Sequence, residues 1–230
     1  MTSSDFVQFE RGVLNMKETI FGLYAPTYAS NCYSIFGKTG SMDMLTLNSN
    51  YESWYRDTQG PTPEGSDLRL SAWFGSTLEV SPACVKMINS MFDSGSSDSQ
   101  YSGDSYLGVN LIRIPEMYYI MAECDPDPQS SAEILDMVRF KRGIASSDAT
   151  DGGKGYDEPD TREGFDSGHT RRINEVMREY LKEYYGEGQL FYFYKRHNYV
   201  TFANCSLVDV RTKYQFPLPE NEDMFGITGK

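Results

Sequence analysis

The pattern of apolar and polar positions divides the chain near residue 110. From residue 111 onward apolar residues recur at helical spacing, whereas residues 1–110 hold only short apolar runs between Gly-, Pro- and Ser-rich stretches. The sequence therefore predicts a loop-rich part, 1–110, and a helical part, 111–230. Within the first part, residues 15–31 predict at most a short helix, followed by a loop from Pro26 onward.

The stretch 111–124, LIRIPEMYYIMAEC, predicts the first long helix. Pro115 suits its first turn, because the missing amide hydrogen is not needed there. The apolar residues that share one face are Met117, Ile120, Met121 and Cys124. The following DPDP ends the helix.

A second helix is predicted to follow at once. Ser130 and Glu133 have the spacing of a capping box at its start, and Gly143 marks its end. Its inward residues are Ile134, Leu135 and Val138. Two helices joined by a short connector form an antiparallel hairpin, the unit of helical repeat proteins.

A third helix is predicted from about 171 to 196, with Thr170 as its N-cap. Its helical period runs through Ile173, Met177, Tyr180, Leu181, Tyr184, Gly188, Phe191 and Tyr194. The aromatic residues of YYGEGQLFYFYKRHNY, 184–199, are therefore expected to lie mostly in the core. Each interior glycine costs ~1 kcal/mol relative to alanine, so a close helix contact at Gly186 and Gly188 is expected to offset that cost.

The same helix carries four glutamates at i, i+4 spacing: Glu175, Glu179, Glu183 and Glu187. Like charges at this spacing repel, so cations are expected nearby, with Arg178 and Lys182 the closest in sequence. A glycosidase acid–base pair needs two carboxylates that face each other across a cleft. A row on one helix favours a structural ion-pair network.

Composition narrows the range of functions that the chain can have. The chain has 33 acidic and 21 basic residues, a net charge of −12, and such a surface repels phosphate backbones, so general nucleic-acid binding is not expected. Aromatic residues make up 14% of the chain, with 17 Tyr, 13 Phe and 2 Trp. This surplus exceeds what an ordinary core needs and suggests that some aromatic faces are exposed.

Metal, cofactor and membrane signals are weak. The four cysteines, at 32, 84, 124 and 205, form no CxxC pair and are expected to be free thiols. The aspartates between residues 145 and 168 lack EF-hand spacing, so a solvated loop is expected there. No apolar run is long enough for a membrane span, and the first residues do not form a signal peptide. No cofactor is expected.

Four stretches occur in an order that resembles one protein family, the SusD/RagB-like outer-membrane nutrient-binding lipoproteins of Bacteroidetes. The stretches are KETIFGLY; LIRIPEMYYIMAEC, with Arg113, Glu116, Ala122 and Glu123; ILDMVRFKRGI, with Val138, Arg139, Arg142 and Gly143; and REYLKEYYGEGQLFYFYKR, followed by KYQFPLPENE with Pro217, Leu218, Pro219 and Glu222. The chain is similar to the C-terminal portion of such proteins.

The resemblance implies a mainly α fold of tetratricopeptide-repeat-like hairpins, with a loop-rich irregular region and few short strands. It implies capture of glycans at the cell surface and their delivery to a SusC-like TonB-dependent transporter. The location it implies is the outer membrane, reached through a lipid anchor that is absent from this sequence. Part of the ligand surface in the family lies in an N-terminal half that has no counterpart here.

Sugar sites stack a flat aromatic ring on a pyranose face and hydrogen-bond its hydroxyl rim. Binding residues concentrate in loops, so the candidates come from residues 1–110. They are Trp54, Tyr55, Trp73, Phe74, Tyr28, Asn31 and Tyr101, with Arg56, Asp57 and Asp67 for the rim. Asp67 also lies close enough to Arg69 in sequence to form a structural pair with it.

Two other functions fit the sequence. A glycoside hydrolase would use Asp or Glu from the loops, and release of reducing sugar would reveal it. A helical-repeat adaptor would bind a protein partner and would not respond to sugars. The glycan-binding protein without catalytic activity is the leading hypothesis, because no nucleophile–base or metal constellation is present in the sequence.

Overall fold

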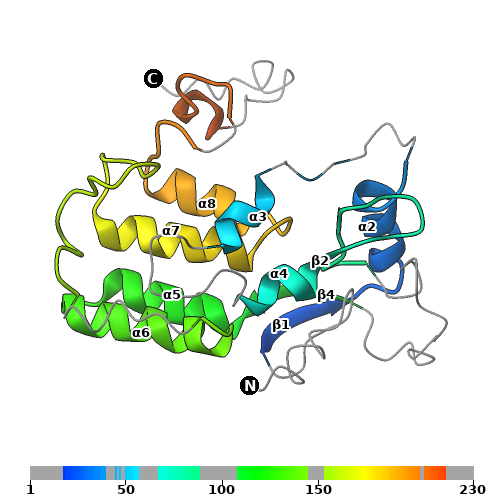
Figure 1. Cartoon of the computed structure of the whole chain (residues 1–230), viewed down its shortest axis with the longest axis horizontal. Coiled ribbons are helices and arrows are strands. Elements are labelled where there is room, and N and C mark those ends of the chain that lie inside the picture. The colour runs from blue at the N-terminus through cyan, green and yellow to red at the C-terminus, as the bar shows by residue number, and fades with distance from the viewer. Residues whose placement is uncertain are drawn as a thin grey trace, which may run out of the picture. The chain divides into compact units, whose positions relative to one another are not determined.

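The computed structural model describes residues 18–39, 45, 47, 50–56, 67–88, 108–144, 153–202 and 205–215. These residues are mainly helical, with seven α-helices and two small antiparallel sheets of two strands each (Figure 1). This confirms the predicted mainly α class with few short strands. The chain forms two compact units, Met1–Glu183 and Tyr184–Lys230.

Among the described residues the first element is a strand rather than the predicted short helix. Strand β1, Thr19–Tyr24, pairs antiparallel with β4, Gly108–Arg113. Strand pairing with a segment about 90 residues away cannot be recognised from local periodicity, which explains the wrong prediction. The loop predicted after Pro26 is also wrong, because α2, Tyr28–Phe36, follows directly.

The described residues on either side of 57–66 form a small core. Helices α3, Tyr51–Tyr55, and α4, Leu68–Trp73, lead into β2, Phe74–Gly75, which pairs with β3, Ala83–Cys84. The ring centroids of Tyr51 and Tyr55 lie 4.8 and 5.3 Å from that of Phe74. Because these rings pack on one another, the part predicted to be loop-rich contains a folded aromatic core.

The predicted helical hairpin is present as α5, Ile114–Cys124, and α6, Pro128–Lys141, which pack against each other. Pro115 lies in the first turn of α5, as predicted. The predicted capping box of α6 is wrong: the N-cap is Asp127, whose carboxylate accepts a hydrogen bond from the amide of Ser130. Beyond α6, Gly143 adopts a left-handed φ of 83°.

Helix α5 has apolar residues on its exposed face as well as on its buried face. Its inward residues are Pro115, Tyr119 and Ala122. The residues predicted to share a face do so, but that face is exposed: Met117, Ile120, Met121 and Cys124. In α6, by contrast, the predicted inward residues Ile134, Leu135 and Val138 are buried.

The predicted single helix over 171–196 is wrong. The chain forms α7, Arg171–Glu183, and α8, Gln189–Arg196. Gly186 and Gly188 lie between them with left-handed φ angles of 77° and 93°. A Cβ on Gly188 would meet nothing within 4 Å, so no close helix contact explains that glycine. Gly188 lets the backbone turn with a positive φ, a conformation that costs free energy for residues with a Cβ.

Helix α7 is the centre of the first unit, where it packs against α5, α6 and α3 (Figure 1). The hydroxyl of Thr170 accepts a 3.4 Å hydrogen bond from the amide of Ile173, which confirms the predicted N-cap. The second unit contains α8 and a 3₁₀ turn, η4, Arg211–Lys213. In it the rings of Tyr194 and Phe202 stack with centroids 4.6 Å apart.

Candidate functional site

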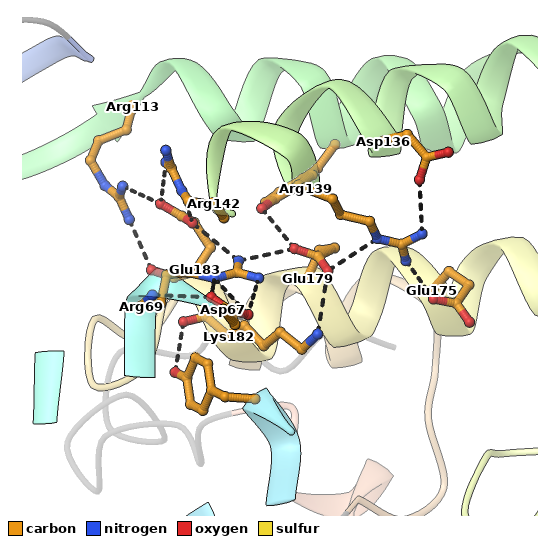
Figure 2. Close-up of polar contacts among 12 residues, drawn as sticks. Asp67, Arg69, Arg113, Asp136, Arg139, Arg142, Glu175, Glu179, Lys182 and Glu183 are labelled. Atoms are coloured by element: carbon orange, nitrogen blue, oxygen red, sulfur yellow. Dashed lines mark hydrogen bonds and ion pairs between the residues drawn. The ribbon is translucent and has the colours of Figure 1, made fainter. Parts of the chain in front are cut away.

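The face of α7 that lies inside the protein is charged. Its buried residues include Glu175, Glu179, Lys182 and Glu183, whereas Ile173, Met177 and Leu181 are partly exposed. The predicted helical period of apolar residues therefore does not mark the buried face of α7 at these three positions. Buried carboxylates require partners, and the partners come from other elements (Figure 2).

We call these groups the buried ion-pair network. Its members are Glu18, Asp67, Arg69, Arg113, Asp136, Arg139, Arg142, Glu175, Glu179, Lys182 and Glu183. The arginines come from α4, β4, α6 and the residue that ends α6. The network therefore joins α7 to α4, β4 and α6.

Glu183 is the most heavily paired member. Arg142 donates to both of its carboxylate oxygens, at 3.0 and 2.9 Å, and Arg113 donates at 2.6 Å. Arg69 adds a longer contact of 3.3 Å. Arg142 also donates to both oxygens of Glu18, at 3.0 and 2.9 Å, and so links α7 to the residue before β1.

The other two glutamates extend the network along the helix. Glu179 accepts from Arg69 at 2.9 Å and from Arg139 at 3.3 Å, and Lys182 lies 3.6 Å away. Glu175 pairs with Arg139 and with Arg162, each at 2.5 Å. The sequence-adjacent cations are the more distant partners, since Arg178 lies 4.0 Å from Glu175. The predicted ion-pair network is confirmed for Glu175, Glu179 and Glu183, but its main partners were missed. The fourth glutamate of the predicted row, Glu187, lies beyond the end of α7.

The C-terminal end of α7 is held in the same way. Lys86 and Arg113 both donate to the main-chain carbonyl of Glu183, and the Tyr55 hydroxyl donates to that of Lys182 at 2.9 Å. The last carbonyls of a helix have no partner within the helix. Here side chains from three distant segments supply those partners, two of them cations that also suit the negative end of the helix dipole.

Electrostatics keep the glutamates ionised. Burial alone raises the pKa of Glu175, but Arg139, Arg178 and Arg162 outweigh it and bring the pKa to about 2. Burial likewise raises the pKa of Glu179 and Glu183. For Glu179, Arg69 and Lys182 outweigh this effect and hold the pKa well below the usual range. For Glu183, Arg142 and Arg113 do the same. A general acid needs a raised pKa, so these carboxylates do not suit that role.

The structure places four of the predicted sugar-contacting residues inside the protein. Trp73 is 0% exposed, Tyr55 and Phe74 lie in the aromatic core, and Lys86 sits 4.0 Å above the Trp73 ring. Asp67 is buried and pairs with Arg69 at 2.8 Å, which confirms the alternative prediction that the two residues form a structural pair. The expectation that these aromatics lie in loops is wrong, because they belong to α3, α4 and β2.

The remaining candidates are more accessible. Asn31 and Arg56 are exposed, Arg56 pairing with Glu52 at 3.0 Å, and Trp54 is partly exposed on α3. Tyr28 is partly exposed and its hydroxyl contacts the Met87 sulfur at 3.3 Å. Tyr101 and Asp57 lie outside the described residues.

Sequence reasoning missed a pair of exposed aromatics. Tyr192 is 70% exposed and Phe191 36% exposed on α8, whereas the neighbouring Phe193 and Tyr194 are buried. The prediction of one helix through both glycines placed the aromatic residues of 184–199 mostly in the core. With α8 starting at Gln189, the 100° step per residue puts the first pair on the opposite side from the second.

The described residues contain no group of His, Cys, Asp and Glu suited to hold a metal ion. In the same ranges, none of the helices has the length and apolar character needed to cross a membrane. The four cysteines are free, as expected.

Comparison with known proteins identifies no relative. No family model, curated protein or solved structure matches the chain. Any function must therefore follow from the motifs of the sequence and from the geometry above.

Proposed function

We propose that this protein binds glycans at a bacterial cell surface without cleaving them and passes them to a SusC-like TonB-dependent transporter. The observation that carries the proposal is the meeting of four separate motif stretches in one buried network. Glu18 lies in the first stretch, Arg113 in the second, Arg139 and Arg142 in the third, and Glu179 with Glu183 in the fourth.

This convergence gives the motifs a physical reason to occur together. A buried arginine without its glutamate, or the reverse, costs several kcal/mol, so each stretch requires the others. Such interdependence is expected of motifs that specify one scaffold. It supports the SusD-like scaffold of tetratricopeptide-repeat-like hairpins, of which α5 and α6 would be one hairpin.

The chemistry of the α7 carboxylates argues against a glycosidase acid on this helix. A glycoside hydrolase needs a carboxylic acid that stays protonated near neutral pH. The buried glutamates of α7 have the opposite property, because guanidinium groups lower their pKa. Among the described residues the buried carboxylates of the network thus serve the fold.

In the first unit the residues that would contact sugar are the accessible candidates Trp54, Arg56, Tyr28 and Asn31. Trp54 and Arg56 lie on or directly after the short helix α3, and Tyr28 and Asn31 lie on α2. A partly exposed indole offers a stacking face, and the guanidinium and amide offer hydrogen bonds to hydroxyl groups. Tyr55, Trp73, Phe74 and Asp67 are assigned to the core.

The test is affinity electrophoresis of the 230-residue protein in gels that contain one polysaccharide each, across neutral and acidic polymers. Retardation by at least one polymer, with no release of reducing sugar during prolonged incubation, is the expected result. Sustained sugar release would show a hydrolase. Absence of retardation by every polymer would overturn glycan binding.

Variants locate the site in the first unit. Trp54→Ala is expected to weaken retardation, whereas Phe140→Ala, which removes a half-exposed aromatic from α6, is expected to leave it unchanged. Equal retardation of both variants and the parent would remove Trp54 from the site. Delivery is tested separately, by uptake of the bound glycan in cells that carry or lack a SusC-like transporter.

A further inference from the structure

The outward face of α8 combines two aromatic rings with two cations. Phe191 and Tyr192 are exposed, and one turn later Lys195 and Arg196 are exposed as well. At 100° per residue these four positions span an arc of about 140° on one side of the helix. We call them the α8 aromatic–basic face.

We propose that the α8 aromatic–basic face binds an acidic polysaccharide, one whose sugar rings carry carboxylate groups. The inference rests on the proposed glycan binding and names the class of glycan. Its basis is the arrangement of stacking groups and cations on one short helix.

Helix α8 differs in charge from the chain as a whole. The whole chain has a net charge of −12, yet α8 contains Lys195 and Arg196 and no Asp or Glu. At physiological ionic strength charges are screened beyond about 8 Å. A polyanion in contact with α8 therefore interacts chiefly with these cations, and less with distant acidic residues.

The aromatic pair is supported from its own unit. The Phe191 ring meets the rings of Tyr192 and Tyr214 edge to face, with centroids 5.7 and 5.8 Å apart. The Tyr214 hydroxyl donates to the carbonyl of Tyr199 at 2.9 Å, which fixes that ring in turn. A ring held in this way loses little conformational entropy when it contacts a ligand.

The spacing suits a sugar acid. Phe191 and Lys195, and likewise Tyr192 and Arg196, are i, i+4 neighbours, whose Cβ atoms lie about 5–6 Å apart. A pyranose ring stacked on an aromatic face would thus present its carboxylate to a cation one turn away. The guanidinium of Arg196 also lies over the Phe193 ring, 5.3 Å from its centroid.

One such contact is weak, because exposed ion pairs contribute about 1 kcal/mol or less. A polysaccharide repeats the same ring and charge along its length, so rebinding of neighbouring residues raises the overall affinity. The face therefore fits a polymer better than a single sugar.

The experiment uses polygalacturonate as the probe and fully methyl-esterified pectin as its neutral counterpart, which keeps the sugar backbone and removes the charges. Binding of the 230-residue protein is measured by affinity electrophoresis at low and high salt. Polygalacturonate is expected to retard the parent, the ester to retard it much less, and high salt to reverse the retardation.

The test variants are Tyr192→Ala and the double variant Lys195→Gln/Arg196→Gln, each expected to weaken polygalacturonate binding about tenfold or more, equivalent to about 1.4 kcal/mol. The control is Phe140→Ala/Lys141→Gln, which removes an exposed aromatic and an exposed cation from α6 and is expected to bind like the parent. Urea midpoints near the parent value establish that each variant is folded.

The outcomes separate this inference from the proposed function. Binding of neutral glycans without binding of polygalacturonate would overturn the inference alone, whereas binding of neither would overturn both. Equal retardation by poly-glutamate would show simple ion exchange, and stronger retardation by single-stranded DNA would show a nucleic-acid surface. Either result, or polygalacturonate binding that the α8 variants do not weaken, would overturn the inference.

Discussion

Arg142 and Glu183, 41 residues apart in the chain, form a two-point ion pair that is closed to solvent. Arg142 ends α6 and Glu183 ends α7, so the pair ties the C-terminal ends of two helices together. A planar guanidinium matches both carboxylate oxygens at once, which makes this geometry stronger and more directional than a single contact. The stability of the first unit should depend on it.

Glu183→Gln is expected to destabilise the protein by about 3–5 kcal/mol, because Arg142 and Arg113 would lose the charge that compensates them inside the protein. Urea unfolding followed by tryptophan fluorescence measures the loss. Glu52→Gln is the control, since it removes an exposed pair with Arg56 and is expected to cost less than about 1 kcal/mol. Similar midpoints for the two variants would contradict a structural role for the network.

Stability is expected to fall in acid. The pKa of Glu175 is about 2 in the folded protein and about 4.3 in an unfolded chain. A carboxyl group whose pKa is lower in the folded state adds stability that is complete above the unfolded pKa and is lost as the pH falls toward the folded one. Urea midpoints measured from pH 7 to pH 2 should therefore drop below about pH 5. Midpoints that stay constant down to pH 3 would be inconsistent with these pKa values.

Gly188 gives a test of backbone conformation. Its φ of 93° disfavours any residue with a Cβ, while the space around it is open. Gly188→Ala and Gly188→Leu should therefore cost similar amounts, about 1–2 kcal/mol, and Gly188→Asn less. Thermal unfolding distinguishes this from steric crowding, under which leucine would cost far more than alanine.

The two tryptophans should respond differently to truncation. Trp73→Ala removes a fully buried ring and is expected to cost about 3–5 kcal/mol. Trp54→Ala removes a partly exposed ring and is expected to cost about 1 kcal/mol. Calorimetric unfolding of both variants measures the difference. A larger loss for Trp54 than for Trp73 would show that the assignment of core and surface is reversed.

Local signals in the sequence determined much of the helical part. Pro115, Gly143 and Thr170 mark helix boundaries where the structure has them, because capping and backbone restrictions act within a few residues. The inward positions of α6 also follow from periodicity. The i, i+4 row of glutamates was visible in the same way, and its interpretation as an ion-pair network was correct for Glu175, Glu179 and Glu183.

The tertiary structure alone decided which face of α7 turns inward. By the usual preference of charged side chains for solvent, Ile173, Met177 and Leu181 should be inside and the glutamates outside. Instead the glutamates are buried and these three residues are partly exposed, because guanidinium groups reach the glutamates from positions 13 to 114 residues away. Burial of a carboxylate costs several kcal/mol unless a partner offsets it, and whether the partner arrives depends on how distant segments pack. No local pattern in the sequence contains that information.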